Sequence, residues 1–127
     1  MSKTFMILLM LFLHIVDDYY LQGILAAMKQ KEWWREHAPQ QLYRYDYIVA
    51  LIMHSLSWSF MIMLPIAIVN SFNVGIGFVA VFVINTILHG VIDDLKANKK
   101  KINLIADQSF HLSQIAITAM IFIRGAI

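Results

Sequence analysis

The chain has 127 residues, of which 60% are hydrophobic and only 14% are charged. A soluble domain has roughly 45–50% apolar and about 25% charged residues, so the composition excludes an ordinary water-soluble globule and also a disordered chain. A net charge of +2 offers no clustered basic surface for nucleic acid, and the absence of cysteine excludes disulfides and thiolate metal sites. The sequence therefore predicts a small integral membrane protein with one domain over residues 1–127.

Four segments are apolar enough and long enough to cross a bilayer as helices, which takes about 20 residues each. In chain order they are residues 5–25, 47–69, 74–92 and 102–123. Turn-forming residues at 70–73 join the second and third segments, which predicts an antiparallel hairpin. Pro65 lies late in the second segment, where a kink or an early end is tolerated. The predicted fold is an all-α, four-helix transmembrane bundle.

A cleaved signal peptide is the alternative for the first segment, because Lys3 precedes an apolar run over residues 5–13. No small-residue cleavage site follows this run, and His14, Asp17 and Asp18 come instead. We therefore expect the segment to be retained as a helix.

Basic residues are concentrated in two of the predicted loops. The first of these loops holds Lys29, Lys31, Arg35 and Arg44, and the second holds Lys96, Lys99, Lys100 and Lys101. Only Lys3 and Arg124 lie on the other side of the predicted bundle. Because cytoplasmic loops carry an excess of Lys and Arg, we expect both loops in the cytoplasm and both termini outside, in a multi-pass protein of the bacterial inner membrane.

Aromatic residues accompany the basic residues of the first loop. They are Trp33, Trp34, Tyr43, Tyr45 and Tyr47. Such residues anchor proteins at the level of lipid headgroups, so we expect an interfacial helix over residues 29–45. Membrane lipid is the predicted partner of this surface, and homo-oligomerisation stays open.

Ionisable side chains recur inside the predicted spans, where each costs about 2.5–3.5 kcal/mol at the bilayer centre and therefore indicates a function. Three His–Asp pairs are spaced four residues apart and so share a helix face: His14 with Asp18, His89 with Asp93, and Asp107 with His111. At a rise of about 1.5 Å per residue, these pairs and His54 fall into one layer toward the cytoplasmic side. We expect Asp17 to be a neighbour of this layer.

Four imidazoles and three carboxylates form a ligand set for a divalent metal such as Zn, Mn or Fe. The predicted metal ligands are His14, Asp18, His54, His89, Asp93, Asp107 and His111. Seven ligands exceed the needs of one tetrahedral zinc ion and suit two ions that share a carboxylate, so we expect one or two ions. Such a centre makes hydroxide available at neutral pH for attack on phosphorus or a carbonyl.

These ligands predict a membrane-embedded, metal-dependent hydrolase that acts on a phosphoester or on another anionic substrate, either a small molecule or one linked to lipid. Lys96, Gln108 and Gln22 are the candidate catalytic residues that would steady such a substrate.

Other functions of the same residues stay open. The Asp–His pairs could neutralise one another and hold the helices together as a structural network, without metal, in a membrane interaction protein. Intramembrane Asp and His residues also line metal and proton transport paths, although the outer half of the predicted bundle offers little beyond Asn85, Ser59 and Thr118. A di-iron oxidase acting on lipid is a further alternative.

The motifs around these residues resemble those of the DUF3307 family, small membrane proteins of bacteria and phages. The stretch from His14 to Gln22 resembles the opening H-x-x-x-D-aromatic-x-L-Q of that family, and His54 matches its isolated histidine. Residues 89–96 resemble its H-x-x-x-D-x-x-K motif, and residues 107–112 resemble its D-Q-x-x-H-L motif. The resemblance covers all four predicted spans in order.

Two positions qualify the resemblance. Tyr19 stands where phenylalanine is usual, and Asp17 is not a family position, which favours Asp18 as the ligand. The family has no known function, so the resemblance implies an architecture and a set of site residues but no substrate.

Overall fold

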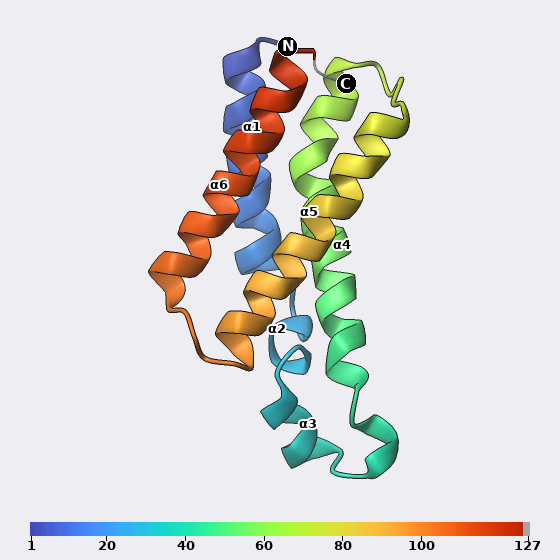
Figure 1. The fold of residues 1–127 in the computed structure, drawn as a ribbon, viewed down its shortest axis with the longest axis vertical. Coiled ribbons are helices and arrows are strands. Elements are labelled where there is room, and N and C mark those ends of the chain that lie inside the picture. Colours follow the sequence, from blue (N-terminus) through green and yellow to red (C-terminus); the bar gives the residue numbers. More distant parts are fainter. Residues whose placement is uncertain (126–127) are drawn as a thin grey trace.

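The structure, a computed structural model, describes residues 1–125, and within them it contains helices and no strand. In chain order the elements are α1 (Lys3–Val16), a π-helical turn (Asp17–Leu21), α2 (Leu25–Met28), α3 (Lys31–His37), a 3-10 turn (Gln41–Tyr43), α4 (Asp46–Val69), α5 (Ile76–Ala97) and α6 (Leu104–Ile123). The four long helices lie alongside one another, and α4 packs against both α5 and α1 (Figure 1). The all-α prediction is confirmed.

The start of α1 and the end of α6 lie at one end of the molecule (Figure 1). Lys3 Nζ accordingly donates to the carbonyl oxygen of Ile123 at 3.4 Å. The segment with α2 and α3 and the connection from α5 to α6, which carry seven of the ten basic residues, lie at the opposite end (Figure 1). The molecule therefore separates its termini from its two basic connections.

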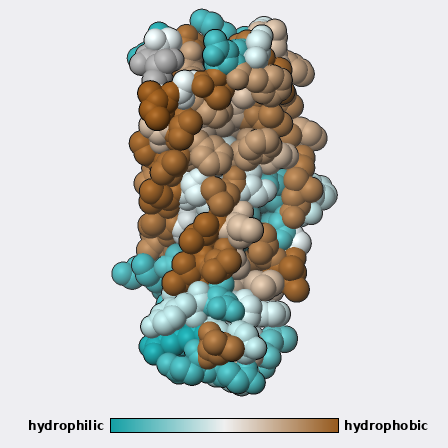
Figure 2. Space-filling model, turned by 90° about the vertical axis from the view of Figure 1, so that its right-hand side faces the viewer, coloured by the Kyte–Doolittle hydropathy of each residue, from teal (hydrophilic) through white to brown (hydrophobic). Residues whose placement is uncertain are grey.

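Among residues 1–125, three stretches are long enough and apolar enough to cross a membrane: Lys3–Leu21, Gln41–Val69 and Ile76–Ala97. Helix α6 is not among them, and its sequence includes the polar residues Asp107, Gln108, His111 and Gln114. Figure 2 shows a mostly hydrophobic band between more hydrophilic ends. By length and composition, this is a protein with three candidate membrane spans.

Helices α4 and α5 form the predicted antiparallel hairpin. Ser71 (φ 52°) and Phe72 (φ 60°) adopt left-handed backbone in the connection, and the Phe72 N–H donates to the Ala67 carbonyl oxygen at 2.7 Å. This contact closes the end of α4 in the manner of a helix C-cap. Pro65 lies inside α4, which nevertheless continues to Val69.

The first predicted span, residues 5–25, is not one continuous α-helix. Helix α1 ends at Val16, the π-helical turn carries the chain to Leu21, and Gly23 then adopts a φ of 51°. This left-handed backbone favours glycine, so Gly23 ends the helix at a place that hydropathy does not reveal.

The predicted helix over residues 29–45 is also shorter in the structure. Helix α3 ends at His37, and the 3-10 turn Gln41–Tyr43 follows it. Pro39 disfavours helical backbone at the preceding residue, and Ala38 accordingly has φ −147° and ψ 72°. The third predicted span, residues 74–92, ends too early, because α5 continues past Ile92 to Ala97.

The bundle interior is divided into an apolar part and a polar part. The apolar core contains Met6, Met10, Trp58, Ile62, Met63, Ile66, Val81, Ile115 and Ala119. The polar part contains the buried histidines and aspartates of α1, the π-helical turn, α4, α5 and α6. Since a hydrocarbon environment supplies no water to satisfy such groups, the helices themselves must do so.

Helices α4 and α5 approach each other closely where Gly90 faces Ser55. A Cβ added at Gly90 would lie 3.0 Å from Ser55 Oγ but 3.8 Å from Ser55 Cβ. We expect Gly90→Ala to destabilise the protein by about 1–3 kcal/mol through overpacking, and Ser55→Ala in the same chain to restore most of this loss. Thermal unfolding of the four proteins of this double-mutant cycle in detergent measures the effect.

Gly75→Ala is the matched control, because a Cβ at Gly75 would meet nothing within 4 Å. Equal destabilisation of the Gly90→Ala protein with and without Ser55→Ala would contradict the close approach.

Candidate metal centre

The three His–Asp pairs predicted from helical spacing are each in contact. The separations are 3.4 Å for His14 Nδ1 to Asp18 Oδ2, 3.8 Å for His89 Nε2 to Asp93 Oδ2, and 3.4 Å for His111 Nε2 to Asp107 Oδ1. His54 of α4 lies between the pairs, and all seven side chains are buried. The structure therefore gathers the seven predicted ligands into one cluster.

His54 and His89 form the centre of this cluster, with their Nε2 atoms 3.1 Å apart. Asp18 Oδ1 lies 3.3 Å from His54 Nε2 and 4.0 Å from His89 Nε2. Asp93 Oδ2 lies 3.4 Å and 3.8 Å from the same two nitrogens. A tetrahedral ion with bonds of about 2.0–2.2 Å separates its ligand atoms by roughly 3.4 Å, which is close to these separations.

A second group of ligand atoms shares the carboxylate of Asp93. Its other oxygen, Oδ1, lies 3.5 Å from His111 Nε2, which in turn lies 3.4 Å from Asp107 Oδ1. Ligand atoms of His89, Asp93 and His111 lie within 4.8 Å of one another, as do those of Asp18, His54 and His89. Asp93 therefore lies where a carboxylate shared by two ions would lie.

Several ligand atoms of the cluster are buried without a hydrogen-bond partner among the described residues. They include Asp18 Oδ1, Asp107 Oδ1 and His111 Nε2. Buried polar atoms in native proteins almost always have a partner, and leaving one without costs free energy. The three atoms face the two groups described above, so a bound cation would satisfy them.

The charges of the cluster also favour a cation. Four carboxylates are buried, those of Asp17, Asp18, Asp93 and Asp107. Two lysines pair with them: Lys29 Nζ lies 2.7 Å from Asp93 Oδ2, and Lys96 Nζ lies 2.7 Å from Asp107 Oδ2. With neutral histidines a formal charge of about −2 remains, which one divalent cation would balance; burial of uncompensated charge costs several kcal/mol per ion.

His14 differs from the other predicted ligands because both of its ring nitrogens have protein partners. The indole N–H of Trp58 donates to His14 Nδ1 at 2.8 Å, and His14 Nε2 lies 3.1 Å from Gln108 Oε1. The structure thus places His14 beside the central ligand atoms.

Trp58 is a residue of the site that the charged motifs do not reveal. It is fully buried and stacks on the ring of His89, with 4.2 Å between ring centroids. Its position four residues after His54 places both on one face of α4, which is the signal that could have found it.

Asp17 and Asp18 are both buried, although successive residues of an α-helix point about 100° apart. The π-helical turn starts at Asp17, and such a bulge changes the direction of side chains at functional sites. Asp17 Oδ2 lies 3.6 Å from His54 Nδ1, and Asp17 Oδ1 accepts a hydrogen bond from the Ser57 hydroxyl. Carboxylates orient metal-binding histidines through the second ring nitrogen, and the Asp17 carboxylate lies on this side of His54, although at 3.6 Å it makes no hydrogen bond to the ring.

A cavity of about 110 Å³ opens beside the cluster. Its lining includes Asp18, Gln22, Lys29, Asp93, Lys96 and Gln108. The three predicted substrate contacts, Lys96, Gln108 and Gln22, therefore meet at one cavity.

Lys29 also faces this cavity, although the sequence shows it only as one of several loop charges. Its Nζ donates to Gln22 Oε1 at 3.0 Å as well as to Asp93. Asn98, at the end of α5, donates to the Lys29 carbonyl oxygen at 3.0 Å and accepts from the Lys31 N–H at 2.7 Å. These tertiary contacts, which have no local sequence signal, bring Lys29 into the bundle.

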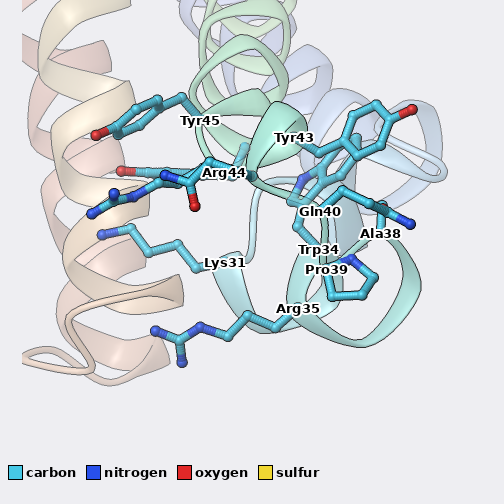
Figure 3. A pocket seen from close by; sticks show the side chains of 11 residues that line it. Lys31, Trp34, Arg35, Ala38, Pro39, Gln40, Tyr43, Arg44 and Tyr45 are labelled. Carbon is cyan, nitrogen blue, oxygen red and sulfur yellow. The ribbon is translucent and has the colours of Figure 1, made fainter.

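A larger pocket of about 340 Å³ lies outside the cluster, at α3 and the turn before α4 (Figure 3). Its lining includes Lys31, Trp34, Arg35, Tyr43 and Arg44, and none of the seven predicted ligands. Basic and aromatic side chains of this kind occur where proteins meet lipid headgroups. The chemistry of the cluster therefore does not extend to this pocket.

A family model described as a protein of unknown function, DUF3307, matches residues 5–126. The chain belongs to this family. No curated protein and no solved structure matches this chain. The matched residues of this DUF3307 protein include α1 from residue 5 onward, the other three long helices and all seven predicted ligands, but the family description supplies no activity.

The buried pair of Lys29 and Asp93 makes a testable contribution to stability. Lys29 is only 7% exposed, so Lys29→Met would leave a buried carboxylate without its ammonium partner and is expected to cost about 3–5 kcal/mol. The matched control is Lys99→Met: Lys99 lies 3.3 Å from Asp94, but its side chain is 51% exposed, so we expect a loss of at most about 1 kcal/mol. Chemical unfolding in mixed detergent compares the two, and equal stabilities would contradict the buried pair.

Proposed function

We propose that this DUF3307 protein is a four-helix membrane protein whose His–Asp cluster binds divalent metal and hydrolyses a phosphate ester. Helix α6 would be the fourth span, because Asp107, His111 and Gln114 are buried between helices and need not face lipid. The basic connections would lie in the cytoplasm and the termini outside, following the excess of Lys and Arg, in the inner membrane of a bacterium.

The observation that carries the proposal is the spacing of the four central ligand atoms. They are His54 Nε2, His89 Nε2, Asp18 Oδ1 and Asp93 Oδ2. Each nitrogen lies 3.1–4.0 Å from the other nitrogen and from both carboxylate oxygens, which is close to the spacing that one ion needs. Nitrogen and oxygen ligands of this kind suit Zn, Mn or Fe. A second ion would use the remaining oxygen of Asp93 together with Asp107 Oδ1 and His111 Nε2.

Bound divalent metal would polarise a phosphoryl oxygen and make hydroxide available at neutral pH. The protein's own residues supply the other requirements. Lys29 and Lys96 place two ammonium groups at the cavity, where they attract a phosphate group. Gln22 and Gln108 offer amide groups to orient it, and Asp17, whose Oδ2 lies 3.6 Å from His54 Nδ1, would orient the ring of His54.

Metal or proton transport is a second candidate, because polar contacts continue from the cluster toward the termini. His111 Nδ1 lies 3.4 Å from Gln114 Oε1, Gln114 Nε2 donates to Asn85 Oδ1 at 3.3 Å, and Asn85 Nδ2 donates to Thr118 Oγ1 at 2.9 Å. The apolar core, including Ala119 in α6, closes the bundle toward the termini. A path through one chain would have to cross this core, so we favour hydrolysis; flux of zinc or protons into liposomes would decide for transport.

Metal content tests the site without any substrate. We expect protein purified in mild detergent without chelators to carry one or two divalent ions, and His89→Ala to lose the central ion because His89 supplies one of its four ligand atoms. His37→Ala is the control, since His37 is an exposed histidine of α3 outside the cluster. Elemental mass spectrometry gives the stoichiometry, and wild-type protein without bound metal would favour a purely structural network.

Hydrolysis should depend on the metal, and also on Asp17 through the orientation of the metal ligand His54. Removal of metal with a chelator is expected to abolish cleavage of p-nitrophenyl phosphate, and added metal should restore it. Asp17→Asn is expected to weaken metal affinity or activity by about 10–100-fold, because the amide holds His54 less well. A competition assay with a metal indicator measures the affinity, and unchanged affinity would contradict the role of Asp17.

A further inference from the structure

An apolar groove of about 640 Å³ lies between α1 and α6 on the outside of the bundle. Leu11, Ile15 and Leu112 form its apolar walls, while His14, Tyr19 and Gln108 form a more polar end. Ile15 and Leu112 are 47% and 46% exposed, so the groove faces the surroundings of the helices, which in the proposed orientation is lipid. Its volume falls in the range of about 300–1,000 Å³ that is usual for small-molecule sites.

The groove adjoins the cavity beside the His–Asp cluster. Tyr19 and Gln108 line both of them. At this junction Gln108 Oε1 lies 3.1 Å from His14 Nε2, and Gln108 Nε2 donates to Asp107 Oδ2 at 3.0 Å. Tyr19 and Gln108 stand between the groove and the cavity, so a molecule that extends from the outer surface to the ligand atoms would pass between α1 and α6 by displacing Gln108 from His14.

The two ends of this path differ in chemistry. The groove is mostly apolar, whereas Lys29 and Lys96 both line the cavity. An apolar chain gains free energy by lying in the groove, and a phosphate group gains charge-assisted hydrogen bonds from the two lysines. Only a molecule with an anionic head and a hydrocarbon tail would satisfy both ends.

We propose that the substrate is a lipid phosphate ester that enters sideways from the bilayer, with its hydrocarbon chain in the groove and its phosphate between Lys29 and Lys96. This inference rests on the proposed hydrolase function and names its substrate class. In the reaction, the oxygen of water bonds to phosphorus, the bond from phosphorus to the lipid oxygen breaks, and that oxygen takes up the proton that the water gives, so the lipid leaves as an alcohol. The phosphate is released through the cavity toward the basic connections.

Photolabelling tests the route without turnover. The probe is an alkyl phosphate with a diazirine in its chain, added to the full-length protein in phospholipid nanodiscs. We expect label on peptides from the groove, within residues 11–20 and 108–112. Leu112→Trp should reduce labelling of residues 11–20 roughly tenfold, equivalent to about 1.4 kcal/mol of binding, because the indole fills the groove.

Leu88→Trp is the matched control, because Leu88 has the same exposed fraction of 46% and lies on α5 outside the groove. Ile15→Trp provides a second groove variant if Leu112→Trp does not fold. Labelling that is unchanged in both groove variants would overturn the lipid route. Equal labelling of the groove by the matching alkyl alcohol, which has no phosphate, would overturn the assignment of the headgroup to Lys29 and Lys96.

Cleavage of p-nitrophenyl phosphate separates the two proposals. If wild-type and Leu112→Trp proteins cleave this soluble ester equally and are labelled equally, the lipid route is wrong and the hydrolase proposal stands. If the protein binds no metal and cleaves no ester, the hydrolase proposal is wrong, and with it the groove's role as a substrate site.

Discussion

The structure depends on the burial of carboxylates and histidines among apolar helices. The Nε2 atoms of His54 and His89 lie 3.1–4.0 Å from each other and from carboxylate oxygens of Asp18 and Asp93, and Asp93 also contacts His111 of α6. Such groups are stable in a low-dielectric interior only when they are paired or bind a cation. The helices are therefore held in register by polar contacts on one half of the bundle and by apolar packing on the other.

Helical spacing explains how much of this arrangement could be predicted. The pairs four residues apart are in contact because the α-helix has a fixed period, and the hairpin of α4 and α5 follows from the short turn between them. Other features depend on tertiary contacts or on local departures from that period. Examples are the π-helical turn at Asp17 and the hydrogen bond from Asn98 to the Lys29 carbonyl oxygen. Neither has a distinct pattern in hydropathy or charge.

The site is open toward one end of the bundle and closed by apolar packing toward the other. The cavity beside the cluster is lined by Lys29 and Lys96, from the end that carries the basic connections, while apolar residues including Ile62, Ile66 and Ala119 fill the bundle toward the termini. This asymmetry fits chemistry at one membrane face better than passage across the membrane. It also explains why α6 is less apolar than the other long helices, since its polar residues Asp107, His111, Gln114 and Thr118 are buried in the bundle.

X-ray absorption spectroscopy of the metal-loaded protein tests the central claim most directly. The account predicts a first shell of nitrogen and oxygen atoms, at about 2.0–2.2 Å for zinc, with outer-shell scattering from the imidazole rings of His54 and His89. That imidazole scattering should fall in His89→Ala and persist in His37→Ala. A shell without imidazole scattering, or one that His89→Ala leaves unchanged, would contradict the account.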